Sequence, residues 1–457
     1  MTHTAEHTSH YENEFRSNPL YDCDPRAFDL LNVEVLDVRN DGYEINVGSS
    51  HDPAYERPDK IVEVYDYLKV RDLQLAEARG SIIRSELGSL GVNPLKRSAR
   101  KKKLIYSALE PLREDLLFGE NETDSMPWHR QRGRAAALIT IAQAHELETP
   151  SSPGLYPTMS GLLDTSLVAH QFGPNDDGVA NMSLRDAIIH AETTYGKRDT
   201  RIAALIAEKR IKELEEFVTS PTSDRFKEVV QYCSDSLGIR ARKEEVNGRL
   251  NLHIDDQIQN GRDPHDILMM SFGCGTALPM LEVLRDIKTA YGAAPKLILL
   301  DQDPLALAAA FQLAKKMDLE DSIEIHCARL FSRFGAPVDL ETILHGRELD
   351  IAEDSGLREY LDDRTYKKLT RETWSRLKEG GLMTTGNMNA NRPQAEFLHG
   401  MMGWQPSVQM RGVKDGFRLH ESAGVPKGSS RGVITRDGIY TMIYSTKSSS
   451  SPVSFAA

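Results

Sequence analysis

Cysteine is scarce in this sequence. Only four cysteines occur among 457 residues, at Cys23, Cys233, Cys274 and Cys327, and no two of them form a CxxC pair. Disulfide frameworks and structural zinc sites usually show denser or more regularly spaced cysteines. We therefore expect no disulfide and no metal site, and this cysteine usage fits a reducing cytoplasm best.

Long apolar runs are missing as well. No segment approaches the ~20 apolar residues that a membrane-spanning helix needs. Residues 1–19, MTHTAEHTSHYENEFRSNP, lack the apolar centre of a secretory signal. The hydrophobic content of 40% is nevertheless sufficient for real cores, and 27% of the residues are charged. These features predict a soluble protein without a membrane span.

Positive charge is in deficit. The formal net charge is −12 at pH 7, whereas broad nucleic-acid binding needs a cationic surface that neutralises phosphates. One basic cluster, KRSARKKK at residues 96–103, stands out. We interpret it as the solvated face of a helix, and we expect no nucleic-acid partner.

The pattern of the chain divides it into four parts. Residues 1–55 are polar and weakly periodic, which predicts an irregular N-terminal arm. From Asp59 onward, apolar residues recur at helical spacing, so 56–238 is predicted to be a mainly α-helical domain. Residues 239–447 alternate short β-like runs with helical segments, and 448–457 are predicted to be a flexible tail.

The start of the third part has two interpretations. The segment ARKEEVNGRLNLHIDDQIQNG, residues 241–261, contains an Asn-Gly pair that is typical of a β-hairpin turn. The heavy charge before that pair favours a helix instead. We predict a helix.

The alternation after residue 260 is typical of βαβ units and a parallel sheet. The runs ILMMSF, KLILLD, SIEIHC and LMTTGN are the expected strands, and segments such as LPMLEVLRDIKTAYG are the expected helices. We therefore predict an α/β fold of the Rossmann type for 239–447.

The first expected strand is followed by the turn Gly273-Cys274-Gly275 and then by a helix. Ligands of open α/β sheets bind beside such turns. Three features argue against a dinucleotide: the third glycine of GxGxxG is replaced by Leu278, Asp301 lies 26 residues after Gly275, and Pro279 has no N–H for an anion. S-adenosylmethionine (SAM) fits the pattern better, because its amino-acid end would lie at the turn and its ribose at Asp301.

Residues 267–444 resemble the class I SAM-dependent methyltransferases. SFGCGTA, starting at Ser271, resembles the first motif of that family, and LLDQDPLAL the second. The family often has an acidic residue where this chain has Ser271 and a glycine where it has Ala277. The resemblance implies a mostly parallel seven-stranded sheet with an antiparallel C-terminal strand and SAM as cofactor. The cofactor contacts that it implies are Ser271, Gly273, Cys274, Gly275, Asp301, Gln302, Ala328, Arg329 and Glu353.

A narrower resemblance covers residues 348–393. This segment is similar to methyltransferases that make the methyl ester of 3-hydroxypalmitic acid. That group has a Gly-Leu-x-x-Tyr-Leu stretch, a helix, a Gly-Gly turn and a strand ending in Gly-Asn. The matching positions here are Gly356, Leu357, Tyr360, Leu361, Gly380, Gly381, Gly386 and Asn387.

Three residues are catalytic candidates: Glu353, Asp354 and Asn387. The two carboxylates follow the expected strand LDIA, where one of them could act as a base or orient an acceptor. The alternative is a solvated loop. An amide such as that of Asn387 can orient an acceptor, although asparagine is also common in turns. The expected acceptor is a small molecule or a lipid-like compound with a carboxylate, hydroxyl or amine group.

Two other functions remain open. The stretch GTALPM, residues 275–280, is similar to the Leu-Pro turn of nicotianamine synthases, which implies transfer of the aminocarboxypropyl group from the same cofactor. A cofactor-binding scaffold without catalysis is the second alternative. In an enzyme, 56–238 would act as a lid or acceptor pocket with a hinge at the Pro-rich stretch 148–161. The sequence also leaves a homo-oligomer open.

Overall fold

The computed structural model describes residues 25–48, 57, 59–70, 232–275, 277–301, 307, 310–311, 313–315, 317–332, 336–395 and 408–448. Most of the expected helical region, including the hinge predicted at 148–161, lies outside the described residues, as do 1–24 and most of the predicted tail.

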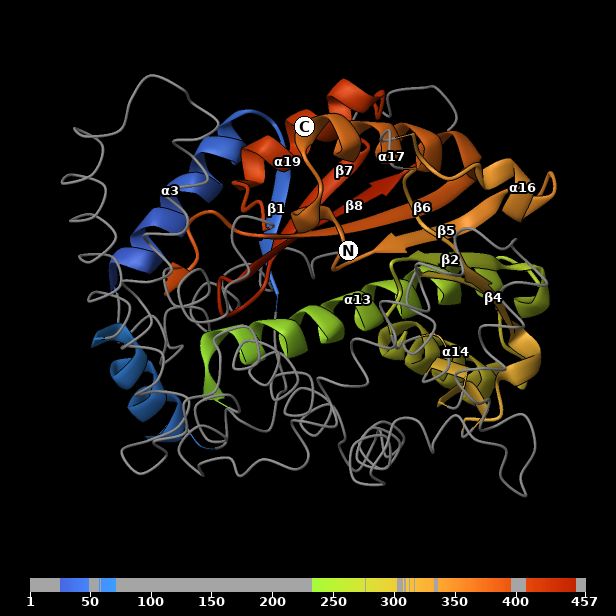
Figure 1. Ribbon diagram of the computed structural model, residues 1–457, viewed down its shortest axis with the longest axis horizontal. Coiled ribbons are helices and arrows are strands. Elements are labelled where there is room, and N and C mark those ends of the chain that lie inside the picture. The colour runs from blue at the N-terminus through green and yellow to red at the C-terminus, as the bar shows by residue number, and fades with distance from the viewer. Residues whose placement is uncertain are drawn as a thin grey trace.

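The described chain is organised around one eight-stranded sheet with the order β1-β7-β8-β6-β5-β2-β3-β4 (Figure 1). Strand β8 runs antiparallel to its neighbours β6 and β7, and every other pair in the sheet is parallel. The strands are β1 Glu44–Val47, β2 Leu268–Phe272, β3 Lys296–Asp301, β4 Ile323–Cys327, β5 Leu349–Asp354, β6 Leu377–Met388, β7 Ser430–Ile434 and β8 Tyr440–Thr446.

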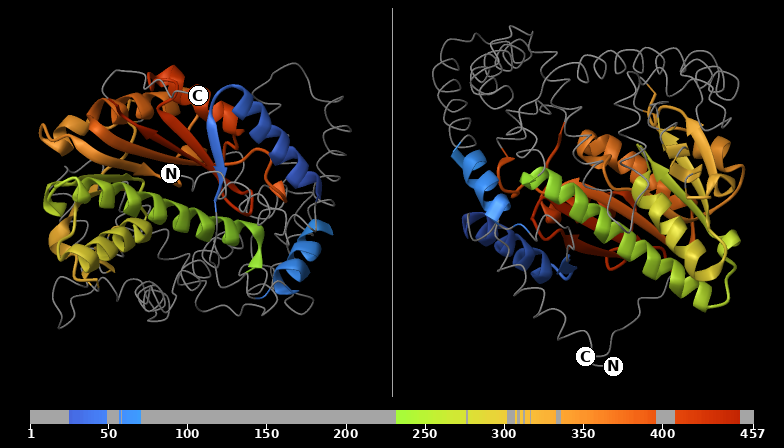
Figure 2. Two further views of the ribbon diagram at one scale, coloured as in Figure 1. Left: turned by 180° about the vertical axis from the view of Figure 1, so that it is seen from behind. Right: turned by 90° about the horizontal axis from the view of Figure 1, so that it is seen from below.

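Helices cover both faces of this sheet, which explains why its central strands are apolar along their whole length. All five residues of β2 are buried. The helices α13 (Ser234–Gln259) and α14 (Leu278–Tyr291) lie on one face, and α16 (Leu340–Leu344), α17 (Asp363–Arg376) and α19 (Val413–Ala423) lie on the other (Figures 1 and 2). The predicted α/β fold of the Rossmann type, with an antiparallel strand near the C-terminus, is confirmed.

Helix α13 includes the Asn-Gly pair that could have formed a hairpin, so the predicted helix is confirmed. Val246, Leu250 and Ile254 recur every four residues and are fully buried in the core that includes α14 and the sheet. The helix begins at Ser234 and therefore crosses the boundary predicted at residue 239. In the described part of the chain, no helix is both long and apolar enough to cross a bilayer.

Residues 1–55 were expected to be irregular, and for part of this range the structure differs. Helix α3 (Pro25–Asn40) and strand β1 form there, and β1 pairs with β7 as the eighth strand, one more than the seven expected. A four-residue strand is too short to show a periodic pattern. It becomes ordered because it satisfies the hydrogen bonds at the β7 edge of the sheet.

The helical pattern expected from Asp59 is confirmed for residues 59–70. Ile61 and Tyr65 of this segment form a buried cluster with Leu237 of α13. Gln394, which follows β6, donates a hydrogen bond of 3.0 Å to the Tyr65 carbonyl. This segment therefore packs directly against the sheet domain.

Candidate functional site

The candidate site lies where four parallel strands end. Strands β2, β3, β5 and β6 run in one direction, so their last residues, Phe272, Asp301, Asp354 and Met388, lie along the same edge of the sheet. This carboxyl edge is where open α/β sheets bind ligands.

The turn after β2 is held by β3. Gly273 and Gly275 both have left-handed backbones, with φ of 60° and 55°. The Gly273 N–H donates to the Leu300 carbonyl at 2.8 Å, and the Gly275 N–H donates to Asp301 Oδ2 at 2.9 Å. A Cβ at Gly275 would meet no heavy atom of the described chain within 4 Å. The turn is thus locked to β3 while its outer side stays open.

Ala277 explains one departure from the methyltransferase motif. It precedes α14 with φ of 55°, the left-handed conformation that glycine adopts without strain, and it is buried. At Ala277 the chain therefore adopts a backbone shape that glycine adopts most easily. It does so with a side chain small enough to pack into the core.

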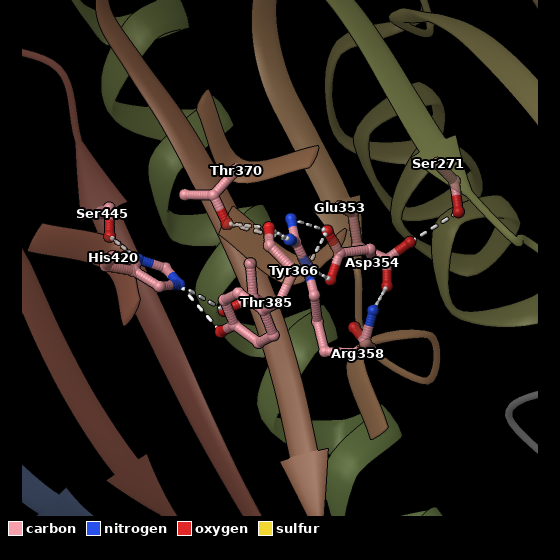
Figure 3. A network of polar contacts seen from close by, with 10 residues as sticks. Ser271, Glu353, Asp354, Arg358, Tyr366, Thr370, Thr385, His420 and Ser445 are labelled. Atoms are coloured by element: carbon pink, nitrogen blue, oxygen red, sulfur yellow. Dashed lines mark hydrogen bonds and ion pairs between the residues drawn. The ribbon is translucent and has the colours of Figure 1, made fainter. Parts of the chain in front are cut away.

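Glu353 lies beside Ser271, the other position at which the chain departs from the methyltransferase motif. Ser271 and Glu353 are paired residues on β2 and β5, and Ser271 Oγ donates to Glu353 Oε2 at 2.6 Å (Figure 3). The Ser355 N–H donates to Glu353 Oε1 at 2.6 Å. A buried carboxylate thus stands next to position 271, where the family often places one in the β2 strand itself.

Asp354 forms a buried ion pair with Arg358. Arg358, which is fully buried, donates to both Asp354 oxygens at 2.6–2.9 Å and also to Thr370 Oγ1 and the Tyr366 carbonyl (Figure 3). Burial raises the pKa of Asp354 to about 6, and the Arg358 guanidinium opposes this effect. The ion pair joins β5 to the short helix η5 (Arg358–Tyr360), and the other hydrogen bonds of Arg358 connect both to α17.

Asn387 lies near the end of β6. It is buried, and within the described part of the chain neither its Oδ1 nor its Nδ2 has a hydrogen-bond partner. The hydroxyl of Ser355, just after the neighbouring strand β5, is also buried without a partner there. Most buried polar groups in proteins are hydrogen-bonded, so these two groups indicate a place for a ligand or ordered water.

The remaining expected contacts follow β3 and β4. The Ala328 N–H donates to the Asp301 carbonyl at 2.8 Å, so the end of β4 lies beside Asp301. Arg329 is the next residue and is partly exposed. Gln302 lies outside the described residues. The structure therefore brings Ser271, the glycine turn, Asp301, Ala328, Glu353 and Asn387 to one edge.

Sequence reasoning missed two charged residues at this edge. Arg242 of α13 donates to the Ser355 carbonyl at 3.1 Å and lies over the Tyr440 ring at 4.4 Å. Glu359 is in the short helix η5 (Arg358–Tyr360) and is almost fully buried. Burial raises the pKa of Glu359 to about 7, and Arg242 opposes it. Glu359 occupies a variable position of the Gly-Leu-x-x-Tyr-Leu stretch, whereas no local pattern marks Arg242.

Cys274 lies in the glycine turn, and its Sγ donates to the Gly275 carbonyl at 3.6 Å. In the described chain, Cys233, Cys274 and Cys327 form no disulfide bond. A search of the described ranges finds no group of three or more His, Cys, Asp or Glu side chains arranged to hold a metal ion.

No family model matches the sequence, and no curated protein matches it. Among solved structures, a possible exported protein from Bordetella parapertussis is similar over 71% of this chain and 100% of its own, with 19% identity and a TM-score of 0.40. An O-methyltransferase family protein from Burkholderia thailandensis matches over 85% and 99%, with 16% identity and a TM-score of 0.36. Magnesium protoporphyrin IX methyltransferase from Synechocystis PCC 6803, solved with bound S-adenosylhomocysteine (SAH), matches over 47% of this chain and 87% of its own, with 11% identity and a TM-score of 0.34. Similarities this low carry no argument about function.

Proposed function

We propose that this chain is a SAM-dependent methyltransferase that acts on a small-molecule or lipid-like acceptor. The observation that supports this most is the charge and hydrogen bonding of the glycine turn. The N–H groups of Gly273 and Gly275 are engaged by β3, and two carboxylates, Asp301 and Glu353, lie at the same edge.

Such a turn suits a cation better than an anion. A pyrophosphate needs free N–H groups at the start of the helix, but those of the turn are engaged, and Pro279 in the first turn of α14 has none. The carboxylates would also repel phosphate oxygens. SAM carries an ammonium and a sulfonium group, so the same negative edge favours it over a dinucleotide.

The residues divide between the two ends of the cofactor. Asp301 would accept hydrogen bonds from the ribose hydroxyls, which a carboxylate can do while it also accepts from Gly275. Glu353 would attract the methionine ammonium, in place of the acidic residue that the family often has at position 271. Ala328 and Arg329 are proposed to lie at the adenine.

When bound, SAM supplies a methyl group on a sulfonium sulfur. The protein then needs to align an acceptor with that methyl group and to exclude water. Asn387 and Ser355, with buried and unpartnered polar atoms at the neighbouring strand ends, are the proposed acceptor contacts. Asp354 has a structural role in this proposal, because Arg358 engages both of its oxygens.

Calorimetric titration with SAM tests the cofactor site. We expect micromolar binding by the wild type, weakened at least about tenfold by Asp301→Ala, since tenfold corresponds to one lost hydrogen bond to a charged group. Asp256→Ala, on the exposed side of α13, is the matched control and should bind as the wild type does. A wild type that does not bind SAM refutes the proposal.

Methylthioadenosine tests the two ends of the cofactor site independently, because it keeps the adenosine but lacks the methionine ammonium. Asp301→Ala should weaken SAM and methylthioadenosine alike, whereas Glu353→Gln should weaken SAM only. Equal effects of Glu353→Gln on both ligands would contradict the role given to Glu353. In turnover, product mass distinguishes methyl transfer, which releases SAH, from aminocarboxypropyl transfer, which releases methylthioadenosine.

A further inference from the structure

We propose that Ser355, Glu359 and Asn387 bind the acceptor through a hydroxyl group, and that Glu359 is the base that takes the hydroxyl proton. This inference rests on the proposed methyl transfer. It adds the class of the acceptor and a catalytic residue that the sequence did not indicate.

The first support is a group of buried polar atoms without partners. Within the described residues, these atoms are Ser355 Oγ, Glu359 Oε2 and both amide atoms of Asn387. The three side chains are only 7%, 2% and 8% exposed. A buried polar atom that nothing satisfies destabilises the folded protein, because it has lost its hydrogen bonds to water. Four such atoms on three side chains of adjoining segments indicate a binding site for a polar group rather than a packing defect.

The second support is their position. Ser355 directly follows β5, and its carbonyl lies so close to β6 that a Cβ at Gly386 would be 2.2 Å from it. Asn387 is the next residue of β6, and the backbone N–H of Met388 is hydrogen-bonded to the Glu359 carboxyl group. The three residues therefore belong to segments that adjoin at the ends of β5 and β6, one strand away from the glycine turn that follows β2.

The third support is the match of donors and acceptors. A hydroxyl group can donate to Glu359 Oε2 while it accepts from Asn387 Nδ2 or the Ser355 hydroxyl. A carboxylate only accepts hydrogen bonds. It could not donate to Glu359 Oε2, and it would face the carboxyl groups of Glu353 and Glu359. The site therefore favours a hydroxyl acceptor over the carboxylate that ester formation would require.

The chemistry also requires a base, and Glu359 has a suitable environment. Burial raises its pKa to about 7, while Arg242 from α13, the Met388 N–H, Arg392 after β6 and Arg411 before α19 oppose that rise. A base is most effective when its pKa is near the working pH. The tyrosines Tyr360 and Tyr440 also interact with the Glu359 carboxyl group.

The proposed step is balanced. The acceptor O–H bond breaks and its proton moves to Glu359 Oε2. The acceptor oxygen forms a bond to the methyl carbon, and the electron pair of the breaking S–C bond stays on sulfur. The products are a methyl ether, SAH and a proton that Glu359 later releases to solvent.

Binding to the protein saturated with SAH is the first test, because it does not depend on turnover. Two matched pairs serve as probes: 2-decanol with decanoate, and 4-butylphenol with 4-butylbenzoate. We expect a hydroxyl member to bind at least about tenfold more tightly than its acid partner, a difference of one good hydrogen bond. Preference for the acids, or no binding of any probe by a protein that binds SAH, overturns the inference. A protein that does not bind SAH refutes the proposed function instead.

Turnover of the preferred hydroxyl probe is the second test. Its kcat should rise about tenfold per pH unit below pH 7 and level off above it. Glu359→Gln should lower kcat by about 10²–10⁴-fold and leave SAM binding intact, which also shows that the variant is folded. Glu379→Gln, an exposed carboxylate at the opposite end of β6, is the control. A Glu359→Gln kcat close to that of the wild type, or a flat pH profile, contradicts the role of Glu359.

Discussion

Replacing Gly386 with alanine tests how closely β5 and β6 approach at the site. The added Cβ would stand 2.2 Å from the Ser355 carbonyl oxygen, whereas carbon–oxygen contacts in proteins are usually about 3.3–3.6 Å. The carbonyl cannot simply move away, because it accepts a hydrogen bond from Arg242 at 3.1 Å. Either β6 or the segment that begins at Ser355 has to shift by about 1 Å.

Overpacking of this kind costs typically about 1–3 kcal/mol, and we expect Gly386→Ala to reach the upper end. For a domain of this size, 3 kcal/mol corresponds to a fall in Tm of roughly 6–12 °C. The matched control is Gly248→Ala in α13. Gly248 is exposed, and a Cβ there meets nothing within 4 Å among the described atoms. Alanine is the better helix former by about 0.5–1 kcal/mol, so this variant should gain roughly 1–4 °C.

Thermal unfolding followed by circular dichroism gives both shifts under the same conditions. The Gly386→Ala protein should also bind SAM more weakly, because the Ser355 N–H orients Glu353. If Gly386→Ala melts within 2 °C of the wild type (about 1 kcal/mol or less), the close approach of the two strand ends is wrong. Gly248→Ala is expected to raise the Tm and Gly386→Ala to lower it. If Gly248→Ala also lowers the Tm, local packing does not explain the effects of the two substitutions.

Three further predictions concern single side chains. Ala277→Val should lower the free energy of unfolding by about 2 kcal/mol in urea, because a β-branched residue fits poorly in a buried left-handed position. Asp354→Asn should cost about 3–5 kcal/mol in the same assay, because it leaves Arg358 buried without its counter-charge; a smaller loss than that of Ala277→Val would contradict this. Burial lowers the pKa of His420 from 6.5 to about 3. Its contribution to stability is therefore complete above pH 6.5 and is lost as the pH falls toward 3, about 2 kcal/mol of it between pH 7 and pH 5. Urea titrations at both pH values should show this loss shrink in His420→Gln but not in His265→Gln, an exposed control.

The His420 network shows which contacts a sequence cannot reveal. His420 of α19 contacts Thr385 of β6, Tyr366 of α17 and Ser445 of β8, each at 3.1 Å (Figure 3). Nothing in the local pattern of any of these four segments distinguishes the residue that takes part. The contacts exist because the sheet brings two of the strands together and both helices pack on the same face.

Short-range patterns determined much of this protein. The alternation of apolar strands with amphipathic segments predicts the α/β sheet, because each element must bury its apolar face against another layer. Gly273, Gly275 and Asp301 could be identified as site residues for a similar reason. Their roles depend on the turn after a strand and on the end of the next strand, and both are visible in the local sequence.

Tertiary structure decided the rest. The pairing of Ser271 with Glu353 depends on the register between β2 and β5, and a shift of one residue would turn one of the side chains to the other face. Arg242 and Glu359 reach the same edge from two helices, α13 and η5, that are more than a hundred residues apart in the sequence. Strand β1 joins the sheet only because β7 offers an edge with unpaired backbone groups. Charges and hydrogen bonds that converge across such separations have no local periodicity, so only the folded chain shows them.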